Sequence, residues 1–208
     1  MHRNRFIYNL LVCIICLILN VLIALFARVC QSPFFFDTIF TVAATIMAGL
    51  IPGLIVAVLF NPLMTFVLCG FFGKEIACFD FLYALCGMAI VFITWLFSRD
   101  KSSFYASRTI TVIYLVIIAI SSALASSFIA SVLDAFLRPL FEKTLGFSPI
   151  DGFFSSFENL NLGAFLSFFL PRVPVTFIDR LICTFAGYFI CRGVDLISTK
   201  KLIAAKEM

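Results

Sequence analysis

The chain has 208 residues, of which 63% are hydrophobic and 12% are charged, and its mean hydropathy is +1.15. Soluble proteins are roughly 45 to 50% apolar, so this composition excludes an ordinary soluble domain and indicates a chain solvated by lipid. The net charge of +4 is distributed over the ends of the apolar segments and does not form one basic stripe, which argues against a nucleic-acid partner.

Six apolar segments have about the length that a helix needs to cross a bilayer, which is roughly 20 residues. They cover residues 6–29, 34–49, 54–72, 79–97, 109–133 and 175–197. Pro52 and Gly53 predict a tight break between the second segment, which is rather short, and the third. The sequence therefore predicts an all-α fold in a single transmembrane domain, residues 1–208, with a bundle of about six helices.

The longest connection, residues 134–172, is rich in Phe and is interrupted by Pro139, Pro149 and Pro171. When Lys and Arg are assigned to alternate sides of this arrangement, the side with both termini receives nine of them and the other side six. Positive residues concentrate on the cytoplasmic side of membrane proteins. We therefore expect cytoplasmic N- and C-termini, an outer position for residues 134–172, and a multi-pass protein of the inner (cytoplasmic) membrane.

Polar side chains inside apolar segments are the first candidates for function, because a charge at mid-membrane costs roughly 2.5 kcal/mol or more. One helical face of segment 34–49 carries four of them, Asp37, Thr38, Thr41 and Thr45. The hydroxyls have an alternative role, bonding to their own helix or packing against a neighbour. Asp37 has the alternative of capping the start of the helix.

Two further segments carry polar groups. Asn61 precedes Pro62, which leaves a backbone carbonyl without its donor, and Asn61 is expected either to bond to Asn20 or to contact a substrate. One side of segment 175–197 carries Thr176, Asp179, Arg180, Thr184 and Tyr188. Asp179 and Arg180 point about 100° apart on a helix, so each is expected to have its own partner, in an ion pair with another helix or in a polar ligand.

Under this topology the outer helix ends bring Asp37 and Asp179 beneath the connection 134–172, which carries Glu158. The Phe side chains of this connection either close over a ligand or anchor it in the membrane interface. The sequence thus predicts a ligand pocket that opens outward. Its candidate residues are Asp37, Thr41, Asn61, Glu158, Asp179 and Arg180.

The sequence contains no recognisable catalytic or cofactor motif. It lacks a phosphate-binding loop, a zinc-protease motif and a nucleophile elbow, and its one His lies at position 2. Cys13 and Cys16 have the spacing of half a metal site, but no second pair follows, so helix packing is the preferred interpretation. We expect no enzyme activity, no metal and no cofactor, with any energy from ATP supplied by another subunit.

Small residues four positions apart mark expected helix contacts. Such pairs are Ala44 with Ala48, Ser122 with Ser126, and Ser126 with Ala130. Small side chains let two helix backbones approach closely in a membrane. We expect these contacts to lie within the chain, with a partner protein as the alternative.

Residues 34–62, FFFDTIFTVAATIMAGLIPGLIVAVLFNP, resemble a hairpin of the substrate-binding S components of energy-coupling factor transporters, and residues 175–192, VTFIDRLICTFAGYFICR, are similar to their final helix. The resemblance implies a six-helix bundle that captures a vitamin-like small molecule at its outer face. It also implies docking on a transmembrane coupling protein driven by two ATPases, and a pocket that includes Asp37, Asn61, Asp179 and Arg180. The alternatives are a membrane sensor or scaffold, and a small ion-coupled carrier.

Overall fold

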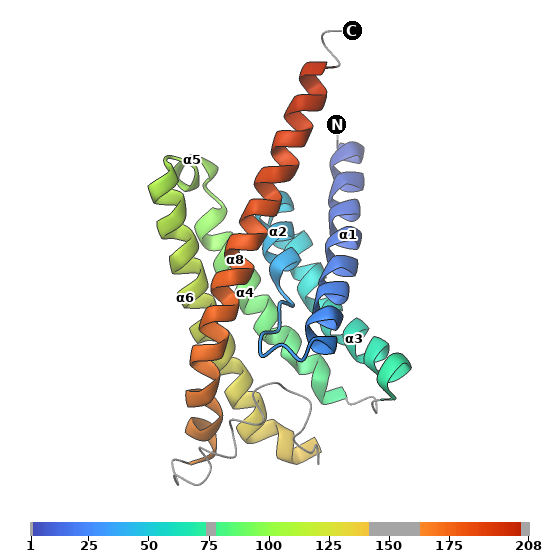
Figure 1. The fold of residues 1–208 in the computed structure, drawn as a ribbon, viewed down its shortest axis with the longest axis vertical. Coiled ribbons are helices and arrows are strands. Elements are labelled where there is room, and N and C mark those ends of the chain that lie inside the picture. The colour runs from blue at the N-terminus through green and yellow to red at the C-terminus, as the bar shows by residue number, and fades with distance from the viewer. Residues whose placement is uncertain (1, 74–77, 142–162, 205–208) are drawn as a thin grey trace.

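The computed structural model describes residues 2–73, 78–141 and 163–204, and within these ranges every regular element is helical (Figure 1). The longer helices are α1 (His2–Val29), α2 (Ile39–Ala48), α3 (Leu50–Phe72), α4 (Ala84–Ser98), α6 (Arg108–Val132) and α8 (Ala164–Ala204). Four short elements are a 3₁₀ turn before α4 (Cys78–Tyr83), α5 (Lys101–Phe104), and a π turn (Leu133–Leu137) followed by a 3₁₀ turn (Arg138–Phe141) after α6.

Five helical segments of the described chain are long and apolar enough to cross a membrane. They are Arg5–Val29, Leu50–Phe72, Phe79–Ser98, Arg108–Leu137 and Ala164–Ile197. The chain is therefore an all-α, multi-pass membrane protein, as its composition predicts. The first turn of α1 and the last turn of α8 lie at the same end of the bundle (Figure 1), which we call the terminal end; the opposite end is the distal end.

The second expected span, 34–49, is wrong in its extent. Only Ile39–Ala48 is helical, and ten residues give a helix of about 15 Å, half the roughly 30 Å of a hydrocarbon core. The preceding chain cannot join this helix because Phe36 has a φ of 52°, which is a left-handed conformation. Asp37 consequently lies in a turn, and Thr38 occupies the N-cap position without a side-chain cap bond. The capping role considered for Asp37 is therefore wrong.

The break between α2 and α3 also differs from the expected one. It occurs at Gly49, whose φ of 96° suits a residue without a side chain. Pro52 and Gly53 instead lie in the first turn of α3. Proline is tolerated there because the first amide groups of a helix have no intrahelical acceptor.

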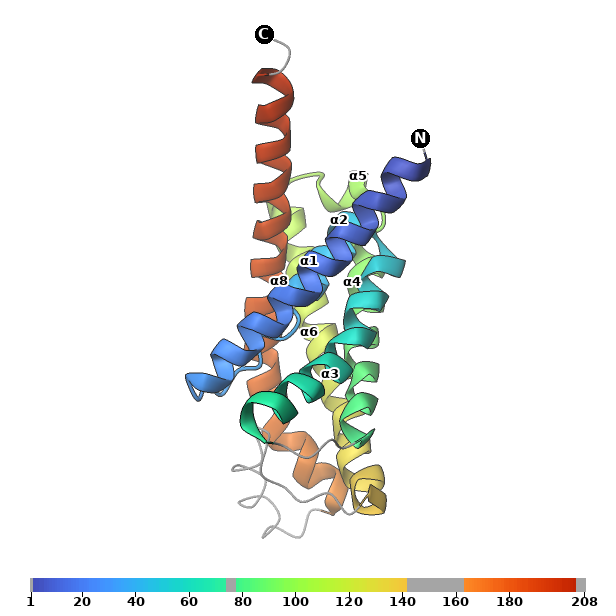
Figure 2. The ribbon, with the colours of Figure 1, turned by 90° about the vertical axis from the view of Figure 1, so that its right-hand side faces the viewer.

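The final helix begins earlier than residue 175. α8 starts at Ala164 and includes Pro171 and Pro174, so the C-terminal part of the expected connection 134–172 belongs to the helix. Figure 2 shows the first turns of α8 inclined to the remainder, as expected where proline removes backbone donors. The middle of that connection, residues 142–162, lies outside the described residues.

Although it is short, α2 lies at the centre of the bundle. It packs against α1, α3, α4 and α8, and Val42, Ala43 and Ala44 are at most 1% exposed. Ala44 belongs to a buried cluster with Cys13 and Cys16, so both cysteines serve in helix packing. The helix that is too short to span the membrane therefore fixes the positions of four others.

The most extensive helix pairing joins α6 to α8. Ser122, Ser126 and Ala130 are all buried on α6, and Ser126 Oγ donates to the Ser122 carbonyl at 2.7 Å. The expectation that these small residues pack within the chain is confirmed.

Candidate functional site

The central polar feature is Arg180 of α8, which binds two carboxylates, one in the turn before α2 and one on α8 itself. Its Nη2 lies 3.2 Å from Asp37 Oδ1 and 3.2 Å from Asp179 Oδ2, and its Nη1 donates to Thr38 Oγ1. Arg180 is thus the one cation of a cluster that joins α8 to the turn before α2. We call these four residues, Asp37, Thr38, Asp179 and Arg180, the arginine cluster.

Asp179 connects the same two parts of the chain through the backbone. Its Oδ1 accepts hydrogen bonds from the amides of Phe35 and Phe36, both at 3.0 Å, and its side chain is completely buried. Two amides outside any helix thereby receive a charged acceptor, which satisfies them in the interior of the bundle. This contact holds the chain in the turn that keeps α2 short.

The expectation of separate partners for Asp179 and Arg180 is only partly right. Each does bind the turn before α2, but the two also form an ion pair with each other. Their Cα–Cβ bonds diverge on the helix, yet the long Arg side chain bends back far enough for its guanidinium to reach the neighbouring carboxylate.

The arginine cluster is unbalanced in charge. Two carboxylates face one guanidinium, so its formal charge is −1 when all three groups are ionised. The side chains of Asp179 and Arg180 are 0% and 7% exposed, whereas that of Asp37 is 27% exposed. Asp37 is therefore the member that a molecule entering from outside the bundle can reach.

A second set of hydrogen bonds attaches α1 to α2 beside the arginine cluster. Asn20 is fully buried; its Nδ2 donates to Thr41 Oγ1 at 2.7 Å, and its Oδ1 accepts from the Phe40 amide at 2.9 Å. Thr45 Oγ1 donates to the Thr41 carbonyl at 2.8 Å. The hydroxyls of α2 thus bond to their own helix and to a neighbour, which is the alternative that the sequence left open for them.

Replacing Asn20 with Leu is expected to lower the free energy of unfolding by about 1 to 3 kcal/mol, because the Phe40 amide would lose a buried acceptor. The measurement is SDS-induced unfolding in mixed micelles, followed by far-ultraviolet circular dichroism. Asn61→Leu is the matched control, since the Asn61 side chain is only partly buried and makes no hydrogen bond within the described chain. Equal losses in both variants would contradict the role assigned to Asn20.

The remaining predicted site residues are not all brought together. Thr41 is 1% exposed and accepts from Asn20. Asn61 lies on α3, where its carbonyl accepts from Thr65 Oγ1 at 3.0 Å; the expected Asn20–Asn61 bond is wrong, because Asn20 is occupied by α2. Glu158 lies outside the described residues. Among the candidate residues that the structure describes, Asp37, Asp179 and Arg180 form one connected group.

A second buried ionic contact was missed by the sequence reasoning. Arg172 Nη2 lies 2.5 Å from Asp134 Oδ2, with side chains 7% and 0% exposed, and Tyr83 donates its hydroxyl hydrogen to the same carboxylate. Arg172 was expected in an outer connection, so its wrong placement follows from interpreting Pro171 as a loop residue. A signal was available in the mostly apolar residues 164–170, which extend the apolar segment upstream of residue 175.

Asp134 lies in the π turn that follows α6, and Arg172 lies on α8 about two turns before Asp179 and Arg180. Comparisons with family models, curated proteins and solved structures find no match for this chain.

Proposed function

We propose that this protein is a membrane-embedded binding subunit, which captures a vitamin-like small molecule at Asp37 for ATP-driven uptake by separate coupling and ATPase subunits. The observation that supports this proposal is the unbalanced arginine cluster, with its one partly exposed carboxylate. The membrane is the inner (cytoplasmic) one, and the distal end faces outward.

The charge imbalance suggests the class of ligand. An excess charge is costly in a membrane protein, and a contact that served only to join α2 to α8 would need one carboxylate for its one guanidinium. A ligand with an ammonium group, or with strong hydrogen-bond donors, would compensate the excess charge at Asp37. We therefore propose a ligand that presents such a group to Asp37.

The direct test compares Asp37→Asn with the wild-type protein. We expect native mass spectrometry of the wild-type protein, purified in mild detergent from its own cells, to detect a bound small molecule. Asp37→Asn should lose most of this molecule, because the amide keeps the size of the side chain while removing its charge.

Asp100→Asn is the matched control for this experiment. Asp100 caps α5, where it accepts hydrogen bonds from Ser102 and Ser103, and an amide at this position also caps a helix. The control should retain the molecule at the wild-type level. Full retention by Asp37→Asn, or absence of any bound molecule from the wild-type protein, would contradict the proposal.

The alternative classes are separable by two further measurements. Co-purification with a transmembrane coupling protein and two ATPases supports a binding subunit, since a sensor or scaffold needs no such machinery. An ion-coupled carrier is favoured by the second buried pair, Asp134 with Arg172, because buried ionisable groups often mark ion pathways. Counterflow by this chain alone in liposomes would support the carrier and contradict the binding subunit.

A further inference from the structure

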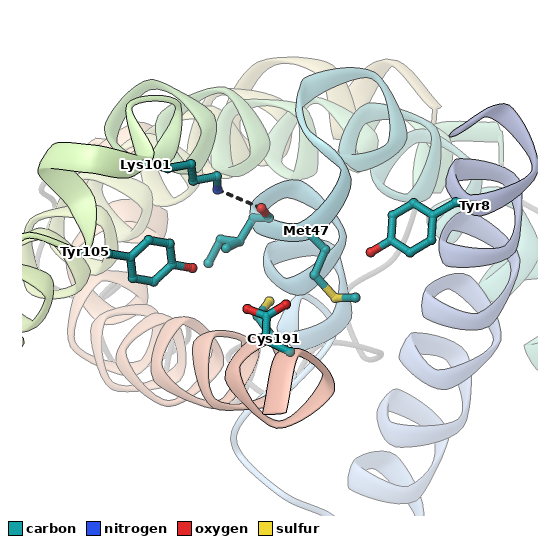
Figure 3. A pocket seen from close by; sticks show the side chains of 7 residues that line it. Tyr8, Met47, Lys101, Tyr105 and Cys191 are labelled. Carbon is teal, nitrogen blue, oxygen red and sulfur yellow. Dashed lines mark hydrogen bonds between the residues drawn. The ribbon is translucent and has the colours of Figure 1, made fainter. Parts of the chain in front are cut away.

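A cavity of about 200 Å³ lies near the terminal end, away from the arginine cluster. Figure 3 shows it between α1, the last turn of α2, the region of α5, and α8. It is lined by Tyr8, Ile46, Met47, Lys101, Tyr105, Cys191 and Asp195. Four separate parts of the chain therefore contribute to the lining of one small space.

The cavity results from the way in which α2 separates two long helices. α1 and α8 both pack against α2 but have few contacts with each other, so the end of α2 forms the floor of a space between them (Figure 3). Tyr8 of α1 is 45% exposed, and Asp195 of α8 is also exposed. The space is accordingly reachable from the surroundings of the bundle.

The cationic side of the cavity is built by Lys101 and its neighbours. Lys101 Nζ donates one hydrogen bond to the Ile46 carbonyl at 2.8 Å, and an ammonium group has two further donors. The guanidinium of Arg192 lies 5.5 Å from the centre of the Tyr105 ring. Lys101 Nζ lies 6.0 Å from the same ring centre. Lys101 and Arg192 are thus both close to the ring of Tyr105, whose hydroxyl points into the cavity (Figure 3).

Burial determines the protonation of these groups. It raises the pKa of Tyr105 to about 12, so this hydroxyl keeps its proton and remains a donor at neutral pH. Burial also lowers the pKa of Lys101, because desolvation disfavours the charged ammonium. An anion beside Lys101 would restore the stability of the charged form.

The surroundings of the cavity match the border of a membrane. The spans at this end begin or finish at Arg5, Ser98, Arg108 and Ile197, and tyrosines are enriched at such borders. Basic residues near the membrane surface attract anionic lipid groups. Asp195, which also lines the cavity, carries a carboxylate, a group that attracts an ammonium group.

We propose that this cavity binds the headgroup of a phospholipid, with its phosphate against Lys101 and the Tyr105 hydroxyl and its acyl chains leaving between α1 and α8. The volume is below the roughly 300 to 1,000 Å³ typical of pockets for larger ligands, so it accommodates a headgroup and not the whole lipid. Phosphatidylethanolamine matches the charges of this lining, since it carries a phosphate and an ammonium group.

The test is a titration of delipidated, full-length protein with dioleoyl phosphatidylethanolamine, with bound lipid counted by native mass spectrometry. Lys101→Gln should weaken binding about five-fold, the effect expected for one cation near a membrane surface. Because Lys101 also bonds to α2, Tyr105→Phe provides a second variant that leaves that bond in place. It should weaken binding roughly two- to ten-fold, through the loss of one hydrogen bond.

Arg108→Gln is the matched control, because Arg108 is an exposed cation at the same end that does not line the cavity. It should bind lipid as the wild-type protein does. An equal loss in Arg108→Gln would show that only the general charge of this end attracts lipid, and would overturn the proposal. Wild-type affinity in both Lys101→Gln and Tyr105→Phe would also overturn it.

Soluble phosphoethanolamine distinguishes a lipid from a free phosphate ester, because it has the same headgroup without acyl chains. We expect it to compete at least ten-fold less effectively than the lipid. Competition at equal concentration would identify a site for a soluble phosphate ester and contradict a lipid site.

Discussion

Arg180→Met is expected to lower the free energy of unfolding by about 3 to 5 kcal/mol, the cost of leaving a buried charge without its partner. Asp179 is completely buried and would lose its ion pair with Arg180. Asp37 and Thr38 would lose their connection to α8 at the same time. The measurement is SDS-induced unfolding in mixed micelles, followed by circular dichroism.

Two controls make this result specific. Arg192→Met removes an exposed cation about three turns later on the same helix, and should change the free energy by less than about 1 kcal/mol. Adding Asp179→Asn to Arg180→Met removes the stranded charge, so the double variant should be more stable than Arg180→Met alone. A double variant as unstable as the sum of the two single changes would contradict the proposed coupling of these residues.

Gly187→Ala is expected to cost about 1 to 3 kcal/mol of unfolding free energy, because it overfills the contact between α8 and α2. A Cβ at this position would lie 2.7 Å from the Ile39 carbonyl oxygen and 3.0 Å from Val42 Cγ1. The Ile39 carbonyl oxygen is a backbone atom, so relieving the contact requires α2 to move. That movement is restricted because α1, α3 and α4 also pack against α2. The shift would also separate α8 from the turn that holds Asp37.

Gly193→Ala provides the control for this prediction. It lies two turns later on α8, and an added Cβ would meet nothing within 4 Å. Alanine should therefore be neutral or stabilise the helix by up to about 1 kcal/mol. The same unfolding measurement applies, and a similar loss in both variants would mean that the contact at Gly187 is not as close as the structure indicates.

The sequence identifies polar residues of the candidate site but not the contacts between them. Asp37, Asp179 and Arg180 could be selected because charges are rare and costly in apolar segments. Their mutual arrangement could not be derived, since it depends on a turn at Phe36 that no local pattern announces. The sequence suggests a bond between Asn20 and Asn61, which are expected at similar depth in two helices. Asn20 instead bonds to α2, because depth alone does not specify which helix faces meet.

The amino-acid sequence alone predicts an all-α protein of long apolar helices, because an apolar chain in lipid must satisfy its backbone groups within each segment. It also indicated which polar side chains are buried in that environment. Three features are visible only in the folded chain: α2 is a short central helix, Arg172 pairs with Asp134, and a cavity lies between α1 and α8. These features depend on contacts between residues far apart in the chain. The extent of α2 is an example, because the Asp179 carboxylate accepts hydrogen bonds from the Phe35 and Phe36 amides, which a longer α2 would have used within the helix.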